Sequence, residues 1–139
     1  MAGIISSDES VTEQLGREFS DCLKTFPSTI ALYGPLGAGK TTWVKGLIVG
    51  LGGKSDDVHS PTFIYLHIYE TKKTPVYHFD LYRLKNSEEF LEKGFDEYLS
   101  NGLTVIEWPE RISSLLPKGT ISLTLDHIDQ QSRRIKWEI

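Results

Sequence analysis

The chain has 139 residues and a mass of 15.7 kDa, with 39% hydrophobic and 24% charged residues, which is typical of one globular domain spanning residues 1–139. Fifteen basic and nineteen acidic residues give a formal net charge of −4, which disfavours autonomous binding to a nucleic-acid backbone. The single cysteine excludes an internal disulfide, and the four histidines lack the paired spacing of a zinc site. No apolar stretch approaches the roughly 20 residues of a membrane span, and the N-terminus has no signal-like pattern, so we expect a cytoplasmic protein.

The first predicted element is an amphipathic helix over residues 10–26. Its apolar side chains recur at three- and four-residue spacing, which places them on one face of a helix. Ser10 and Glu13 match a capping box, and Pro27 ends the pattern. Because Cys22 falls on the apolar face, we expect a small buried side chain there rather than a reactive thiol.

The next segments predict a strand, a glycine-rich loop and a helix. Residues 28–33 form a short apolar run, residues 34–39 are rich in glycine, and a helical pattern then extends from residue 40 to about Gly50. Alternating residues at 63–69 and 76–81 predict two further strands, which a short polar connection joins as a hairpin.

The C-terminal half continues to mix helices with strands. Asn86 or Ser87 starts a helical segment that runs to about Leu99 with an interruption at Gly94. We further expect a buried strand at 103–106, a short helix within 110–116, and a half-exposed hairpin formed by 121–126 and 134–139. This order predicts an α/β fold with a central sheet, part parallel and part antiparallel, flanked by helices.

Residues 34–41, with the sequence Gly-Pro-Leu-Gly-Ala-Gly-Lys-Thr, match the P-loop pattern GxxxxGK(S/T). Glycines in such a loop let backbone N–H groups surround phosphate oxygens that a Cβ would obstruct. Lys40 would contact the β and γ phosphates, Thr41 would offer a hydroxyl to Mg²⁺, and the helix N-terminus adds a partial positive charge. Because a predicted strand precedes the motif and a helix follows it, we expect nucleotide binding rather than an ordinary turn with an exposed lysine. The candidate nucleotide-binding residues are Gly37, Ala38, Gly39, Lys40, Thr41 and Thr42.

Two acidic residues, Asp80 and Glu107, end predicted strands. A P-loop requires such a carboxylate to hold Mg²⁺ directly or through water. The residues themselves do not rank the two, and both could act, one on the metal and the other on the water that attacks the γ phosphate. The chain has no Asn-Lys-x-Asp tetrapeptide, which favours ATP over GTP, and no long insertion that would serve as a lid, which favours hydrolysis over transfer.

Four motifs together resemble the bacterial TsaE (YjeE) family. They are residues 34–42, Ser60-Pro61-Thr62-Phe63, the hexapeptide His-Phe-Asp-Leu-Tyr-Arg at 78–83, and Glu-Trp-Pro-Glu at 107–110. The resemblance spans nearly the whole chain and implies a P-loop NTPase-like fold and an ATPase that is weak by itself. It also implies two partner proteins with sugar-kinase-like folds, whose complex attaches threonylcarbamoyl to adenosine 37 of tRNAs that read codons starting with A.

The resemblance also implies roles for individual residues. Thr41 and Glu107 would be the magnesium ligands, and Lys40 would clamp the phosphates. Asp80 would lie near the γ phosphate and be needed for hydrolysis, so that Asp80 and Lys40 are the candidate catalytic residues. The implied cofactors are ATP or ADP and Mg²⁺.

A second group of residues is a candidate for switching or for contacts with a partner. The resemblance implies a switch-like loop at a proline between two hydroxyl residues. The residues themselves fit a loop that could rearrange when a γ phosphate arrives or leaves, or an ordinary turn before a strand. An aromatic residue and a cation two and three residues after Asp80, and a tryptophan directly after Glu107, could face a partner. These candidates are Ser60, Pro61, Thr62, Tyr82, Arg83 and Trp108.

The leading hypothesis is therefore a Mg²⁺-dependent ATPase subunit that its partners stimulate. No obvious arginine finger is supplied by the chain itself beyond Arg83 and Arg111. A nucleotide-gated binding module that does not require hydrolysis, and a small-molecule kinase, are the alternatives. Because the chain is acidic, we expect tRNA to be contacted mainly through the partners.

Overall fold

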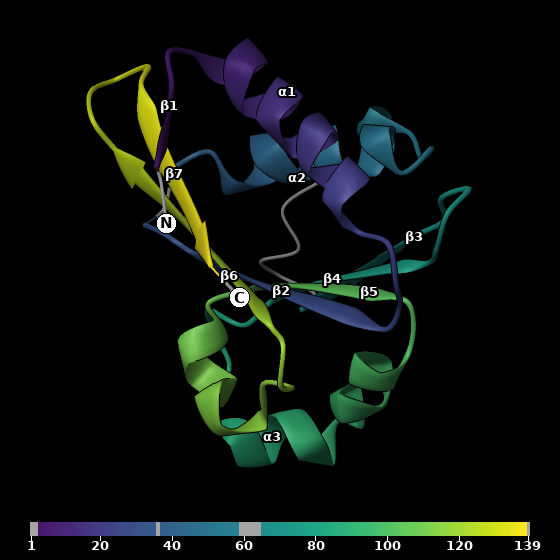
Figure 1. Ribbon diagram of the computed structural model, residues 1–139. Coiled ribbons are helices and arrows are strands. Elements are labelled where there is room, and N and C mark those ends of the chain that lie inside the picture. The colour runs from purple at the N-terminus through teal and green to yellow at the C-terminus, as the bar shows by residue number, and fades with distance from the viewer. Residues whose placement is uncertain (1–2, 36, 59–64, 139) are drawn as a thin grey trace.

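Figure 1 shows the computed structural model, in which a central sheet separates two layers of helices. The structure describes residues 3–35, 37–58 and 65–138. Within these ranges the sheet has seven strands in the order β1-β7-β6-β2-β5-β4-β3. The strands are β1 (Ile4–Ser6), β2 (Ser28–Tyr33), β3 (Leu66–Tyr69), β4 (Val76–Asp80), β5 (Leu103–Glu107), β6 (Ile121–His127) and β7 (Arg133–Glu138).

The middle of the sheet is parallel and its sides are antiparallel. Strand β2 pairs in parallel with β5 and β6, and β4 pairs in parallel with β5. Antiparallel pairs β3–β4, β6–β7 and β1–β7 complete the two sides. The predicted mixed sheet is confirmed, and only the edge strand β1 was not predicted, because three residues are too few to show an alternation.

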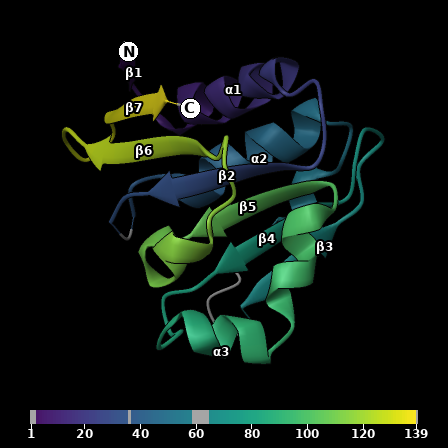
Figure 2. The ribbon, with the colours of Figure 1, turned by 60° about the horizontal axis from the view of Figure 1, so that its bottom comes forward.

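Helices α1 (Glu9–Phe19) and α2 (Lys40–Gly50) cover one face of the sheet, and α3 (Ser87–Glu92) covers the other (Figures 1 and 2). Two 3₁₀ segments, Phe95–Ser100 and Pro109–Leu115, lie on the same side as α3. Each face has its own buried cluster, because side chains alternate along every strand. The cluster under α2 includes Val44, Leu47, Val76 and Val105, and the opposite cluster includes Phe79, Phe90, Ile106 and Ile112.

Helices α1 and α2 approach each other to backbone contact. A Cβ on Gly46 would collide with the carbonyl oxygen of Glu13, and a Cβ on Gly16 would collide with that of Trp43. Glycine at both positions therefore allows the close crossing. As a result, the N-terminal end of α1 lies beside the N-terminal end of α2.

The first helix differs from its prediction at both ends. Its N-cap is Asp8, whose carboxylate accepts the N–H of Val11 at 3.1 Å, whereas the Ser10 hydroxyl donates to Asp8 at 2.6 Å. The predicted Ser10 capping box is therefore wrong. Regular helix ends at Phe19, and a 3₁₀ turn over Ser20–Cys22 replaces the predicted continuation to residue 26.

Cys22 is exposed, so the prediction of a buried cysteine is also wrong. A 3₁₀ turn has about 3.0 residues per turn instead of about 3.6, so the apolar face of α1 does not continue through it. Extrapolating the helical spacing beyond Phe19 placed Cys22 on the wrong side.

The remaining elements agree with their predictions. The carbonyl oxygen of the Asn86 side chain accepts the N–H of Glu89 at 3.0 Å and caps α3, and Gly94 interrupts the helical segment with φ 75°. Strand β3 begins at Leu66, while residues 63 and 64 of the predicted strand lie outside the described ranges. In the described part of the chain, no helix combines the length and apolar character needed to cross a membrane.

Candidate nucleotide-binding site

The glycine-rich loop connects the end of β2 to the start of α2. Gly34, Gly37 and Gly39 have φ values of 150°, 78° and 96°, a region that favours glycine. At Gly34 a Cβ would also collide with the carbonyl oxygen of Leu125 in β6. The pKa of Tyr33, which precedes the loop, lies above its ordinary value of 10.0. Burial of the side chain is the larger cause and the negative charge of Glu110 is the smaller one, so the phenol stays neutral.

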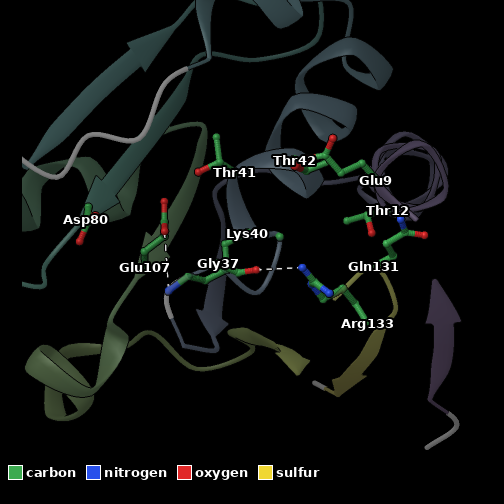
Figure 3. Close-up of a pocket in the computed structure, with 11 residues that line it drawn as sticks. Glu9, Thr12, Gly37, Lys40, Thr41, Thr42, Asp80, Glu107, Gln131 and Arg133 are labelled. Atoms are coloured by element: carbon green, nitrogen blue, oxygen red, sulfur yellow. Dashed lines mark hydrogen bonds and ion pairs between the residues drawn. The ribbon is translucent and has the colours of Figure 1, made fainter. Parts of the chain in front are cut away.

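A pocket of about 290 Å³ lies in front of the N-terminus of α2 (Figure 3). Among the residues that the structure describes, no side chain caps this helix end. The first N–H groups of a helix have no acceptor within the helix and carry partial positive charge, so this end of the pocket suits an anion. The lining residues are Glu9, Thr12, Gly37, Gly39, Lys40, Thr41, Thr42, Asp80, Glu107, Gln131 and Arg133.

Lys40 is held by three neighbours in the pocket. Its Nζ donates to the carbonyl oxygen of Gly34 at 2.8 Å, lies 3.8 Å from Glu107 Oε1, and lies 5.1 Å from the centroid of the Trp108 ring. The Lys40 and Glu107 residues are only 5% and 3% exposed. The ammonium group is therefore already oriented in the pocket. A bound phosphate would compete with the Glu107 carboxylate for it.

The two predicted carboxylates end adjacent parallel strands. Asp80 of β4 and Glu107 of β5 are directly opposite each other in register, and both are buried. Asp80 Oδ1 accepts the N–H of Tyr82 at 2.9 Å, which fixes that carboxylate. Because the carboxyl ends of parallel strands lie at the same edge of a sheet, both groups reach the pocket that the loop after β2 forms.

The oxygen donors of the pocket fit a magnesium ion that also takes oxygens from phosphate. Thr41, Asp80 and Glu107 provide a hydroxyl and two carboxylates. Over the described residues, no group of three His, Cys, Asp or Glu side chains is placed to hold a metal by itself. Mg²⁺ is commonly bound through one or two carboxylates plus substrate phosphates rather than by an all-protein cage.

Trp108 follows Glu107 in a left-handed backbone conformation, with φ 59° and ψ 50°. Such a conformation is uncommon for a bulky residue and is often found at functional sites. The Trp108 ring packs against Tyr82, with ring centroids 4.9 Å apart, and Arg111 donates to the Tyr82 carbonyl at 3.2 Å. Tyr82 and Arg83 are exposed, so these residues form a surface beside the pocket.

Residues from the two ends of the chain line the other side of the pocket. Arg133 Nη2 donates to the carbonyl oxygen of Gly37 at 3.1 Å (Figure 3). The same guanidinium donates to three carbonyls of the β6–β7 turn, those of Asp129 at 2.9 Å, Ser132 at 3.0 Å and Gln130 at 3.3 Å. Arg133 thus braces the loop against the terminal hairpin.

Comparison with known proteins decides the family. The family model described as Threonylcarbamoyl adenosine biosynthesis protein TsaE matches residues 6–135. The chain belongs to the TsaE family. The resemblance that four motifs carried is thereby confirmed, and with it a place among tRNA threonylcarbamoyladenosine biosynthesis proteins.

Proteins similar to this TsaE-family chain come from several organisms. The protein named tRNA threonylcarbamoyladenosine biosynthesis protein TsaE from Rickettsia felis is 40% identical over 131 residues, covering 94% of this chain and 75% of the relative. The protein of the same name from Treponema pallidum is 42% identical over 109 residues, covering 78% of this chain and 79% of the relative. The crystal structure of Bacillus subtilis YdiB matches with a TM-score of 0.77 and 26% identity, covering 98% of this chain and 83% of that one. The predicted α/β fold class is confirmed.

The structure of this TsaE-family member brings seven of the eight predicted nucleotide-binding, metal-binding and catalytic residues to one pocket. Gly37, Gly39, Lys40, Thr41, Thr42, Asp80 and Glu107 all line it. Ala38 is buried, and its N–H donates to the carbonyl of Pro35 at 3.2 Å, so its contact with a nucleotide stays a prediction. The predicted switch loop over Ser60, Pro61 and Thr62 lies outside the described residues and also stays a prediction.

Four residues that line the pocket were missed by the motifs, and a fifth residue of the site was given no role by them. Glu9, Thr12, Gln131 and Arg133 come from segments far from the P-loop in sequence, and no local pattern marks them. His78 contacts Glu107 from the middle of β4; it opens the motif at 78–83 and is a histidine inside an apolar strand, but neither signal indicated its contact with Glu107.

Proposed function

We propose that this chain is a magnesium-dependent ATPase that serves the complex forming N6-threonylcarbamoyladenosine at position 37 of tRNAs reading codons that start with A. The observation that carries the proposal is a single pocket in which the start of α2, Lys40 and two strand-end carboxylates face one another. The chain belongs to a family of tRNA threonylcarbamoyladenosine biosynthesis proteins, which supports the pathway.

The phosphate-binding step would use the loop and Lys40. The N–H groups at the start of α2 would donate to phosphate oxygens, and the Lys40 ammonium would exchange Glu107 for a phosphate. Gln131 and Arg133 also line the pocket, so the nucleoside part of the ligand would lie toward them.

The hydrolytic step would use the two carboxylates in different ways. Glu107 and Thr41 would hold Mg²⁺, which supplies positive charge at the phosphates when bound. Asp80 is fixed by the N–H of Tyr82 and would orient the attacking water and accept its proton. The register of Asp80 opposite Glu107 places both carboxylates at the same end of the pocket.

The isolated chain is expected to hydrolyse ATP slowly. Among the described residues that line the pocket, Arg133 is the only arginine, and its guanidinium already donates to four backbone carbonyls. An arginine free to stabilise charge on the transferring phosphoryl group accelerates hydrolysis by several orders of magnitude in other P-loop proteins. The partners would therefore supply or release such a charge, with tRNA contacted mainly through them.

The surface beside the pocket is the best candidate for the partners. Tyr82 and Arg83 are exposed, and Tyr82 packs against Trp108, which in turn lies over Lys40. A partner that contacted Tyr82 would be separated from Lys40, the proposed phosphate clamp, only by the Trp108 ring. The two partner proteins are proposed to have sugar-kinase-like folds.

A nucleotide-gated binding module is the second candidate. The engagement of Arg133 by four carbonyls favours it, because a pocket whose one arginine among the described lining residues is already engaged suits occupancy better than turnover. The two candidates differ in whether repeated modification cycles require phosphate release.

Asp80→Asn separates the two candidates. The variant keeps an oxygen that can accept the Tyr82 N–H, so the fold and ATP binding should be retained. Phosphate release and multiple-turnover tRNA modification would be measured with both partners, and Asp96→Asn, an exposed site on the other face of the sheet, is the control. Loss of both signals in Asp80→Asn supports the ATPase, whereas loss of phosphate release with undiminished repeated modification supports the module. Transfer of a labelled γ phosphate to an acceptor other than water would instead indicate a kinase.

A further inference from the structure

His78 is a fully buried histidine that no step of the proposed reaction uses. Its side chain lies on the α2 side of β4, and its exposed fraction is 0%. His78 Nε2 is 2.6 Å from Glu107 Oε2, and His78 Nδ1 is 3.1 Å from the Tyr69 hydroxyl. The Tyr69 hydroxyl is in turn 3.3 Å from His67 Nδ1. Both ring nitrogens of His78 are therefore engaged.

The chemistry of the groups sets the direction of these hydrogen bonds. An ionised carboxylate only accepts, so the Nε2–H of His78 donates to Glu107. In a neutral imidazole the other nitrogen is then an acceptor, and the Tyr69 hydroxyl donates to it. Three adjacent strands, β3, β4 and β5, thus hold one imidazole in one orientation against one carboxylate oxygen.

The two oxygens of Glu107 consequently have different partners. Oε2 is committed to His78, while Oε1 faces Lys40 at 3.8 Å and the pocket. Without His78, both oxygens would be available to the buried ammonium group. A closer Lys40–Glu107 pair would withdraw the metal ligand and the phosphate clamp together.

From this geometry we infer that His78 is a positioning residue, which holds one oxygen of Glu107 so that the other stays available to the magnesium ion. The inference rests on the proposed function, because it assigns a cause to the orientation of a proposed ligand. Residues that donate a hydrogen bond to a metal-binding carboxylate typically change metal affinity by about 10–100-fold when they are replaced.

The test is a titration of ADP binding against Mg²⁺ by calorimetry. His78→Phe keeps an aromatic ring in the strand but removes both hydrogen bonds, whereas His78→Gln keeps an N–H that can reach Glu107. Phe79→Leu is the matched control, because it weakens the buried cluster on the opposite face of the same strand without touching Glu107.

We expect His78→Phe to raise the Mg²⁺ concentration for half-maximal ADP binding by about 10–100-fold, with affinity recovering toward the wild-type value at saturating Mg²⁺. His78→Gln should restore most of the wild-type Mg²⁺ requirement. Phe79→Leu should lower the midpoint of urea unfolding and leave the Mg²⁺ requirement unchanged. An unchanged requirement in His78→Phe, or an equal rise in Phe79→Leu, overturns the inference.

Two further outcomes keep the test decisive. If His78→Phe does not fold, Tyr69→Phe removes only the hydroxyl that holds Nδ1 and should raise the Mg²⁺ requirement in the same direction by a smaller factor. No change in that variant overturns the inference as well. If ADP binding to the wild-type chain does not respond to Mg²⁺ at all, the proposed function itself is wrong.

Discussion

Glu107 Oε1 lies 3.8 Å from Lys40 Nζ, so the carboxylate proposed for the metal and the ammonium proposed for phosphate contact each other directly. Both groups are buried, and separating them without replacement would leave two uncompensated charges. A phosphate at Lys40 and a cation at Glu107 together restore the balance. In the proposed function, this one ion pair would therefore couple nucleotide binding to magnesium binding.

Replacement of Lys40 by alanine is expected to weaken ATP and ADP binding. The loss of one charge-assisted contact with phosphate costs about 1.5–3 kcal/mol, which corresponds to about a 10- to 150-fold higher dissociation constant. Calorimetric titration in Mg²⁺ measures it. Lys45→Ala removes the same charge from the same helix at a position that does not line the pocket, and should bind as the wild type does. Wild-type affinity in Lys40→Ala would contradict the role given to Lys40.

Replacement of Glu107 by glutamine is expected to have opposite effects with and without Mg²⁺. In EDTA, the dissociation constant of ADP should fall about tenfold, because no carboxylate competes with phosphate for Lys40. This change corresponds to about 1.4 kcal/mol of binding free energy. Added Mg²⁺ should then improve binding far less than it does for the wild type. Paired titrations in EDTA and in Mg²⁺ measure both effects. The same enhancement by Mg²⁺ in the two proteins would remove Glu107 from the metal site.

Replacement of Gly46 by alanine is expected to destabilise the fold. The new Cβ would meet the carbonyl oxygen of Glu13, so α1 and α2 would have to separate. Overpacking of this kind costs about 1–3 kcal/mol of unfolding free energy, against a gain in helix propensity of about 1 kcal/mol. Urea unfolding measures the change, and Gln14→Ala on the exposed face of α1 is the control. A more stable Gly46→Ala protein would show that the helices are not in backbone contact.

The turn that positions Arg133 is expected to depend on the charge of Asp129. The N–H groups of Ser132 at 2.7 Å and Gln131 at 2.9 Å hold the pKa of Asp129 below its ordinary value of 3.8. A lowered pKa means that this contribution to stability is present above pH 3.8 and is lost as the pH falls through the folded-state value. An NMR titration should show the Ser132 amide shifting with a midpoint below 3.8, and Asp129→Asn should abolish that step. A midpoint at or above the ordinary value would contradict the turn geometry.

Much of the fold was predictable because its signals are local. The glycine-rich segment lies where the flanking strand and helix patterns predict it, since β2 ends at Tyr33 and α2 begins at Lys40. Asn86 caps α3 and Gly94 interrupts the helical segment through side-chain and backbone preferences of single residues. Asp80 and Glu107 were recognisable because each ends an apolar run, and the ends of parallel strands meet at one edge.

Other features depend on competing local hydrogen bonds or on pairing with a distant segment, and residue spacing shows neither. Residue spacing cannot show that Asp8 rather than Ser10 caps α1, or that the helix gives way to a 3₁₀ turn before Cys22, because competing local hydrogen bonds decide both. Strand β1 forms only because β7 offers it a pairing edge.

The amino-acid sequence by itself determined the position of the glycine-rich loop, the order of the elements after β1 and the family, since these depend on neighbouring residues. Tertiary structure alone decided the charge pairing of Lys40 with Glu107, the brace from Arg133 to Gly37 and the contact of His78 with Glu107. Hydrogen bonds and ion pairs act over a few ångströms, and only the packed sheet brings residues 96 positions apart, such as Gly37 and Arg133, within that range.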